Sequence, residues 1–233
     1  MSGHRSRYEG IWKDCTEVLY THVPEGRPIP HDDDVSLPVT VGMSTEELVD
    51  VDGPRVLGMP VYADVGLLQA IPRVVVRSRV RELLIQAAAG LPNGFGISVA
   101  DGWRPLDLQA ELYEEAYADS TLSPGFVSVP DPRPAFVPPH NTGGTVDCTL
   151  TYDGVALALG THFDAFTEDA RVDAFENYPG TVRTLRRLLY WTMVETGFVS
   201  LPKEWWHYEY GTRRWSVIRR EPVLYGPATP ACW

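Results

Sequence analysis

Residues 178–210 constrain the fold most, because a helical pattern and a β-rich pattern follow one another there without a long linker. Five apolar residues in the first part recur at the spacing of one helix face. They are Val182, Leu185, Leu188, Leu189 and Met193. Gly197 provides a stop signal, and the aromatic-rich run at 198–210 favours a strand. We therefore expect a helix that packs against a sheet.

The chain between residues 78 and 152 supplies the other regular elements. Apolar spacing predicts a helix from residue 78 to a stop at Gly90, and residues 96–100 have the composition of a strand. Pro105 lies where a second helix would begin, and residues 145–152 are β-rich. The Pro-rich stretch at 120–139 predicts a long ordered loop. Together these elements predict an α+β fold with helices packed on an antiparallel sheet.

Length and composition are those of a globular protein. The 233 residues suit one domain spanning 1–233, with a loop-rich part at 1–60 and a catalytic core at 78–215. The formal net charge of −11 argues against a nucleic-acid partner, which needs clustered Lys and Arg. No run approaches the ~20 apolar residues of a membrane span, and no secretory h-region is visible. We expect a cytoplasmic protein with no membrane partner, and the oligomeric state stays open.

The first group of chemically distinctive residues is the run from His140 to Asp147. An imidazole nitrogen and a carboxylate oxygen are ligands that zinc accepts. Gly143 and Gly144 lie between them and permit a tight turn, so a loop histidine and a strand aspartate can face each other. Next to Asp147, Cys148 lies in an apolar run and is interpreted as a small core residue. Taken alone, this spacing also occurs on ordinary protein surfaces.

The second group is Glu204-Trp205-Trp206-His207, a carboxylate and an imidazole flanking two indoles. Apolar indoles would wall a site and raise the basicity of a nearby carboxylate. In a strand the two tryptophans would face opposite sides, and we assign Trp205 to the pocket. The alternative is an aromatic core strand with the polar residues at its ends.

The third group is Asp101-Gly102-Trp103-Arg104-Pro105, at a predicted junction from strand to helix. There Arg104 can point a fixed guanidinium into a cleft, or can form a structural pair with Asp101. The three groups together give two imidazoles and one carboxylate with an open position. Three protein ligands plus water are typical of a catalytic zinc site.

In this order, GWRP, HxxGxxxD and EWWHY resemble the motifs of the D-alanyl-D-alanine dipeptidases related to the vancomycin-resistance dipeptidase. These zinc peptidases share a clan with D,D-carboxypeptidases and the Hedgehog domain. The resemblance covers roughly residues 78–215, and EWWH is its most specific motif. The segment from Gly160 to Asp164 resembles the family's GxxFD motif, and Glu195-x-Gly197-Phe198 adds to the likeness.

The resemblance implies one zinc ion per chain, held by His140, Asp147 and His207. It also implies that Glu204 is the general base and that Arg104 stabilises the transition state. The implied fold is α+β, and the implied reaction is hydrolysis of D-Ala-D-Ala or a related small peptide. Further residues are expected to orient the site or contact the substrate. They are Asp101, His162, Asp164 and Trp205.

The sequence also departs from the family pattern. Pro138-Pro139-His140 replaces the usual Ser-x-His, and the family's substrate-binding stretch is not recognisable in residues 50–75. Substrate choice therefore stays open. A D,D-carboxypeptidase or L,D-peptidase would use the same chemistry. Two His and one carboxylate also suit Fe(II) in a non-hydrolytic biosynthetic enzyme, and a zinc-retaining binding module is a further alternative.

Overall fold

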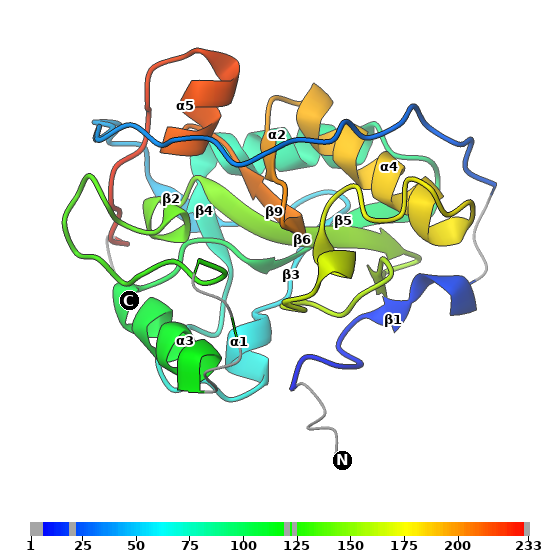
Figure 1. The fold of residues 1–233 in the computed structure, drawn as a ribbon, viewed down its shortest axis with the longest axis horizontal. Helices are drawn as coiled ribbons and strands as arrows, with labels where there is room; N and C mark the ends of the chain where they lie inside the picture. Colours follow the sequence, from blue (N-terminus) through cyan, green and yellow to red (C-terminus); the bar gives the residue numbers. More distant parts are fainter. Residues whose placement is uncertain (1–6, 19–21, 119–121, 123–124, 231–233) are drawn as a thin grey trace.

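The computed structural model describes residues 7–18, 22–118, 122 and 125–230 (Figure 1). The strands are β1 (Lys13–Asp14), β2 (Leu48–Asp50), β3 (Val56–Gly58), β4 (Val75–Arg77), β5 (Phe95–Asp101), β6 (Thr145–Tyr152), β7 (Val155–Ala158), β8 (Val199–Leu201) and β9 (Glu204–Glu209). The helices are α1 (Val61–Asp64), α2 (Ser78–Ala89), α3 (Leu106–Ala118), α4 (Thr181–Glu195) and α5 (Arg213–Arg219). Three 3-10 turns complete the set: η1 (Cys15–Glu17), η2 (Pro139–Thr142) and η3 (Glu168–Ala170).

The main sheet has the strand order β1-β7-β6-β5-β3, and β9 joins it by pairing with both β6 and β8. Its centre is antiparallel, because β6 pairs in that sense with β5, β7 and β9. This confirms the predicted α+β class. Two parallel pairs at the edges, β1–β7 and β3–β5, were not predicted. Parallel neighbours require a long crossover, and α1, β4 and α2 lie between β3 and β5 in the chain.

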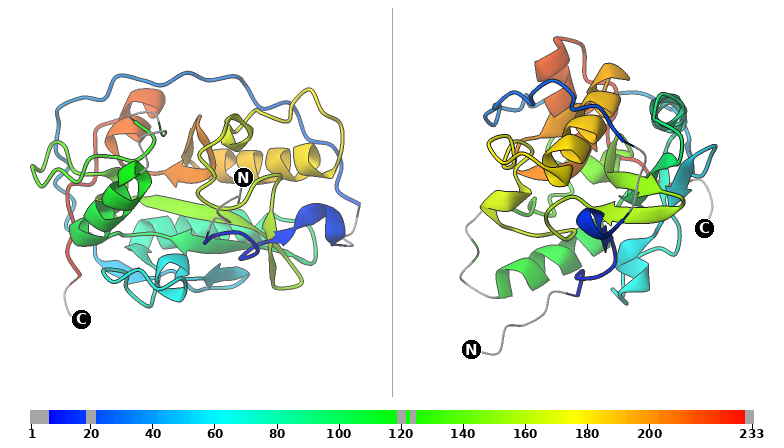
Figure 2. Two further views of the ribbon diagram at one scale, coloured as in Figure 1. Left: turned by 60° about the horizontal axis from the view of Figure 1, so that its bottom comes forward. Right: turned by 90° about the vertical axis from the view of Figure 1, so that its right-hand side faces the viewer.

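Helices α2 and α4 contact each other and the sheet, as the two views in Figure 2 show, while α1 and α3 lie on the other side. The predicted helix faces are those that are buried. Leu185, Leu189 and Met193 of α4 are almost inaccessible to solvent. Gly90 directly follows α2, and Gly197 has the left-handed φ of 108° that favours glycine after a helix.

The register of the central strands brings three polar residues into one row. Asp147 of β6 is the Cα partner of Asp101 in β5 and of His207 in β9. Directly paired residues project to the same face of a sheet, so these three side chains lie side by side. Cys148 follows Asp147 and therefore points to the opposite face, where it is fully buried. Its predicted core position is confirmed.

The N-terminal part contributes side chains to the hydrophobic core. Tyr8, Trp12, Cys15 and Val23 belong to the same hydrophobic cluster as the central strands. From there residues 22–45, which we call the strap, cross over α4 toward α5 (Figure 1). The strap is held by polar contacts such as the bond from the Trp191 indole to the carbonyl of Arg27 (2.8 Å).

The predicted loop at 120–139 is only partly described, since residues 119–121 and 123–124 lie outside the described ranges. Residues 125–138 form neither helix nor strand, and they lead directly into η2, which carries His140. We call residues 125–139 the pre-His140 loop. In the part of the chain that the structure describes, no helix is both long enough and apolar enough to cross a bilayer.

Candidate active site

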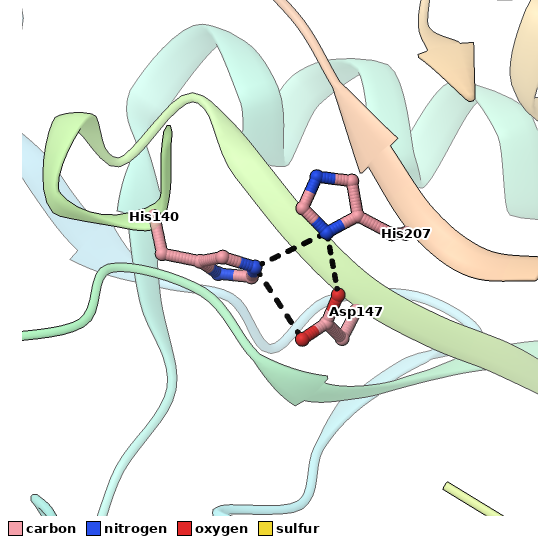
Figure 3. A group of neighbouring side chains, drawn as sticks. All are labelled: His140, Asp147 and His207. Atoms are coloured by element: carbon pink, nitrogen blue, oxygen red, sulfur yellow. Dashed lines mark hydrogen bonds and ion pairs between the residues drawn. The ribbon is translucent and has the colours of Figure 1, made fainter. Parts of the chain in front are cut away.

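The three predicted metal ligands converge at one point, as Figure 3 shows. His140 comes from η2, Asp147 from β6 and His207 from β9. Nε2 of His140 lies 3.4 Å from Nδ1 of His207 and 3.4 Å from Oδ2 of Asp147. Nδ1 of His207 lies 3.1 Å from Oδ1 of Asp147. All three side chains are buried.

Two of these separations fit neighbouring ligands of a tetrahedral metal centre: that between the two imidazole nitrogens (3.4 Å) and that between Nδ1 of His207 and Oδ1 of Asp147 (3.1 Å). Bonds of about 2.0 Å from zinc to nitrogen or oxygen place neighbouring ligand atoms roughly 3.3 Å apart. A second observation agrees with this. Oδ1 of Asp147 is buried and finds no hydrogen-bond partner of acceptable geometry among the described residues, even though the His207 ring is close. Because buried polar atoms are almost always satisfied, this oxygen fits a metal ligand.

The orientation of His140 is fixed by contacts of its Nδ1, the ring nitrogen that faces away from the ligand centre. Its Nδ1 lies 2.9 Å from the carbonyl of Gly102 and 3.1 Å from Oδ2 of Asp101, so a proton on Nδ1 leaves Nε2 free to face the centre. The turn to β6 needs both predicted glycines. Gly143 has a φ of 72°, and a side chain on Gly144 would approach the carbonyl of Tyr210 to 2.4 Å.

The orientation of His207 is fixed by a residue that the sequence did not reveal. Its Nδ1 faces the centre, while Nε2 lies 3.3 Å from Oε1 of Glu209. Glu209 is buried, accepts a hydrogen bond from Thr212 and has Arg214 Nε at 3.6 Å. The sequence did contain a pattern that could have identified Glu209. Residues two apart in a strand share a face, and Glu209 stands two positions after His207.

The pKa values of the ligand side chains reflect their mutual contact. Burial opposes ionisation of Asp147, but the imidazoles of His140 and His207 hold its carboxyl pKa well below the ordinary value. Burial likewise opposes protonation of both histidines, yet nearby carboxylates, above all Asp147, raise the pKa of each. The aspartate is therefore ionised as a metal ligand must be, and a bound cation would replace the histidine protons.

Glu204 lies at the edge of this centre. Its Oε2 is 3.4 Å from Nδ1 of His207, and its side chain is 14% exposed. It is therefore next to the ligands and still open to the cavity. This is the placement that a general base requires.

Arg104 is buried and heavily bonded. Its Nε donates to Oδ2 of Asp101 (2.8 Å), as the structural interpretation of the motif expected. Nη1 donates to Gln109 (2.8 Å), and Nη2 donates to the hydroxyl of Tyr62 (3.2 Å) and lies 3.5 Å from Oδ2 of Asp147. It also lines the cavity, so the pairing with Asp101 and exposure to a substrate occur together.

Asp164 and Tyr62 form a polar pair in the cavity wall. The Tyr62 hydroxyl donates to Oδ2 of Asp164 (2.9 Å). Burial, together with the charges of Asp147 and Glu204, raises the pKa of Asp164 to about 8. The sequence pointed to Asp164 but not to Tyr62, because Tyr62 reaches the site only through the packing of α1 against β5.

Three other predicted substrate residues have different positions. His162 lines the cavity, and its Nδ1 is 2.6 Å from the carbonyl of Phe163. Asp101 is not among the described residues that line the cavity, and it acts on His140 and Arg104 from behind. The pocket-facing position expected for Trp205 is not found: it is 1% exposed, packs against Trp12 and bonds Thr161. The N-terminal segment covers the face that the sequence left open.

The cavity that contains the centre has a volume of about 1050 Å³. The strap, α3, the pre-His140 loop and the turn at residues 162–167 supply its walls. Arg104, His140, Asp147, His162, Asp164, Glu204 and His207 all line it. The ligand centre is thus at the wall of a cavity that is open to solvent and can hold a small molecule.

Comparison with known proteins gives one family. Residues 65–220 match the peptidase M15 model, described as D-Ala-D-Ala dipeptidase. A D-alanyl-D-alanine dipeptidase of Synechocystis sp. is 26% identical over 207 residues, which cover 72% of this chain and 82% of that protein. A D-alanyl-D-alanine dipeptidase of Escherichia coli (strain K12) is 29% identical over 123 residues, covering 50% of this chain and 56% of that protein.

Two solved structures are distant neighbours. One is the vancomycin-resistance D,D-dipeptidase VanXYg with a D-Ala-D-Ala phosphinate analogue, at 18% identity and a TM-score of 0.37; it covers 64% of this chain and 56% of that one. The other is a mutant of the vancomycin-resistance D,D-pentapeptidase VanY with Zn(II), at 18% identity and a TM-score of 0.39; it covers 84% of this chain and 90% of that one. At these TM-scores neither neighbour supports a functional conclusion.

Proposed function

Because this chain belongs to the D-Ala-D-Ala dipeptidase family, whose members are zinc metallopeptidases that hydrolyse dipeptides, we propose that it cleaves D-Ala-D-Ala or a related small peptide. His140, Asp147 and His207 hold the zinc ion. When bound, zinc polarises the peptide carbonyl and activates water as a nucleophile. The observation that carries the proposal is that one ligand atom from each of His140, Asp147 and His207 lies within 4.8 Å of the other two.

Glu204 transfers a proton from the attacking water to the leaving amine. Its carboxylate is close to the ligand centre and accessible from the cavity. It therefore takes a proton from the attacking water and delivers it to the leaving amine.

Arg104 stabilises the negative charge that develops on the oxygen of the peptide bond during hydrolysis. A guanidinium has five N–H donors, and its Nη1, which bonds Gln109, retains a further N–H for a substrate oxygen. Asp101 and Gln109 hold the group in place, so no reorganisation is needed when charge develops on the peptide oxygen.

Asp164 and Tyr62 orient the amino end of the dipeptide. A free ammonium group would ionise Asp164 and form a charge-assisted hydrogen bond with it. The bond to Tyr62 keeps this carboxylate in place. A dipeptide bound in this way presents its only peptide bond to the ligand centre.

A metal analysis combined with a peptide panel tests the proposal. Protein purified without added metal should contain one zinc per chain. It should hydrolyse at least one stereoisomer of Ala-Ala, and lose that activity reversibly on chelation. Tripeptides and muropeptides in the same panel separate a dipeptidase from a carboxypeptidase. A zinc-loaded protein that cleaves no dipeptide would overturn the function, and iron in place of zinc would favour the non-hydrolytic alternative.

A further inference from the structure

The cavity is larger than the reaction centre needs. A volume of about 1050 Å³ lies at the upper end of the range of roughly 300–1,000 Å³ that encloses drug-sized ligands. A dipeptide of two alanines is far smaller than such a ligand. The cavity residues assigned so far lie on the sheet, on its adjoining turns and on helices α1 and α3. The wall formed by the strap and the pre-His140 loop has no role yet.

The same two segments also place the ion-paired residues Asp34, Asp131 and Arg133 at the cavity. We call the apolar part of this wall the outer wall. It consists of Val35, Leu37, Phe126, Val129, Phe136 and Val137. Three of its members belong to the exposed large hydrophobic residues of the protein: Leu37 at 42%, Val129 at 61% and Phe136 at 40%. Apolar side chains that gather at the mouth of a cavity are the type of surface that an apolar ligand group covers.

One cation in the cavity differs from its neighbours. Arg214 and Lys203 both pair with Asp34, and Arg133 pairs with Asp131. Arg213 forms no ion pair with any described residue. It donates instead to two main-chain carbonyls of the pre-His140 loop, those of Ala135 (2.7 Å) and Val137 (3.3 Å).

Among the described residues the charge of Arg213 is offset only in part, because Glu209 acts on it without forming an ion pair. Arg213 is half-buried, and burial lowers its pKa despite the opposing effect of Glu209. Since two of its five N–H donors are used by the loop, others stay available to a ligand. A half-buried guanidinium without a carboxylate partner is a favourable position for an anionic ligand group.

Arg213 and Asp164 line the same cavity with opposite formal charges, which are complementary to the two ends of a dipeptide. Arg213 bonds the carbonyl of Val137, three residues before His140. Asp164 lines the same cavity and contacts Tyr62, which in turn contacts Arg104. An unblocked dipeptide has an ammonium at one end and a carboxylate at the other, which matches this distribution of charge.

We infer that the Arg213 side of the cavity binds the C-terminal residue of the substrate, with its carboxylate on Arg213 and an apolar side chain larger than methyl against the outer wall. This rests on the proposed dipeptidase activity and narrows its substrate class. The substrate is a dipeptide with a bulky apolar C-terminal residue.

The side-chain part is tested with matched dipeptides. The configuration that the enzyme cleaves best in Ala-Ala is kept, and kcat/KM is compared between Ala-Ala and Ala-Leu. We expect Ala-Leu to be preferred by about 10-fold or more, as added methylenes in an apolar pocket give. Val129→Ser should reduce this preference. Val155→Ser, at a similarly exposed site in β7 that does not line the cavity, should not.

The carboxylate part is tested with Arg213→Gln on Ala-Leu and on its C-terminal amide. Loss of a hydrogen bond to a charged group should lower kcat/KM for the free acid about 10- to 100-fold. Hydrolysis of the amide should be unchanged. Arg219→Gln, at the exposed end of the same helix, is the control. An equal loss on acid and amide would show that Arg213 only holds the loop, and would overturn its assignment.

The outcomes separate the two proposals. If neither dipeptide is cleaved in any configuration, the dipeptidase function fails and the substrate class fails with it. If Ala-Ala is cleaved as well as or better than Ala-Leu, the function stands and the inferred substrate class is wrong.

Discussion

The two sides of the cavity are built differently. On one side, Asp147 and His207 line the cavity from adjacent strands, Asp101 supports them from the next strand, and the sheet register fixes their spacing. On the other side, the strap and the pre-His140 loop contribute residues such as Leu37 and Phe136 from irregular chain. Strands tolerate little displacement, whereas loops accept changes in sequence and length.

Because the two sides differ in rigidity, we assign the reaction chemistry to one side and the choice of substrate to the other. Reaction chemistry needs atoms held within a fraction of an ångström, and the sheet side provides this. Substrate choice needs only a wall of suitable shape and polarity, which the loop side provides. We therefore expect substitutions on the sheet side to reduce turnover for every substrate, and substitutions on the loop side to change which substrate is preferred.

The largest effect is expected for Glu204→Gln. The amide cannot accept the proton of water, so kcat should fall on the order of 10²–10⁴-fold for all dipeptides. Zinc content should stay at one per chain, because Glu204 is not assigned as a ligand. The measurement is steady-state kinetics together with metal analysis. Full activity in this variant would remove Glu204 from the role of base.

Arg104→Lys should have the next largest effect. Lysine keeps the charge but cannot bond Asp101, Gln109 and Tyr62 simultaneously, as the planar guanidinium does. We expect kcat to fall on the order of 10²–10³-fold. Thermal unfolding measured beside kinetics shows whether the fold is retained. An unchanged kcat in a folded variant would contradict the role of Arg104 at the oxyanion.

Glu209→Gln should weaken metal binding more than it affects the fold. The neutral amide orients His207 less firmly and lowers the basicity of its ring, so zinc affinity should fall about 10- to 100-fold. Competition with a chromogenic chelator measures this. Glu221→Gln, an exposed site beyond α5, is the matched control. Equal zinc affinity in both variants would show that Glu209 does not act on the metal site.

Asp164→Asn should change how stability depends on pH. Burial raises the folded pKa of Asp164 from 3.8 to about 8, so the contribution of this carboxyl is fully present below about pH 4. It is then lost as pH rises through 8. In metal-free protein the free energy of unfolding of the wild type, taken relative to Asp164→Asn, should therefore fall between pH 4 and 8. Urea titrations at four pH values measure it, and a constant difference would contradict the raised pKa.

The smallest effect is expected for Leu37→Ser on the loop side. Leu37 is already 42% exposed, so stability should change by no more than about 0.5 kcal/mol. The variant should raise KM for Ala-Leu by less than about tenfold and leave kcat unchanged. Leu57→Ser, at an equally exposed site of β3, should alter neither constant. A large fall in kcat would mean that the strap shapes the reaction centre itself.

Much of the sheet side could be predicted from sequence because its signals are local. Helical spacing and stop glycines marked α2 and α4, and the β-rich run at 145–152 matches β6 as observed. The ligand set could be predicted only by combining motifs that are separated in the chain. In the structure, the register of β6 and β9 brings two of these motifs together. Glu209 was accessible to the same period-two argument.

The loop side was not predictable in this way. Tyr62, Arg213 and the outer wall carry no periodic signal, and their positions depend on long-range packing. For Trp205, in contrast, the sequence predicted a place in the pocket that the structure does not show. Alternation in a strand suggested that one indole faces a pocket, but the N-terminal segment brings Trp12 against it and makes that position part of the core. The single-domain organisation, the cytoplasmic location and the absence of nucleic-acid and membrane partners stay predictions.

The residue types of a two-histidine, one-aspartate centre with a nearby glutamate were already evident in the chain, since metal chemistry restricts ligands to a few kinds of side chain. Three features arise only on folding: the groups that hold those ligands in place, the environment that raises the pKa of Asp164 to about 8, and the extension of the cavity to Arg213. Burial, charge pairing and cavity shape all arise between segments distant in the chain. No local pattern encodes them.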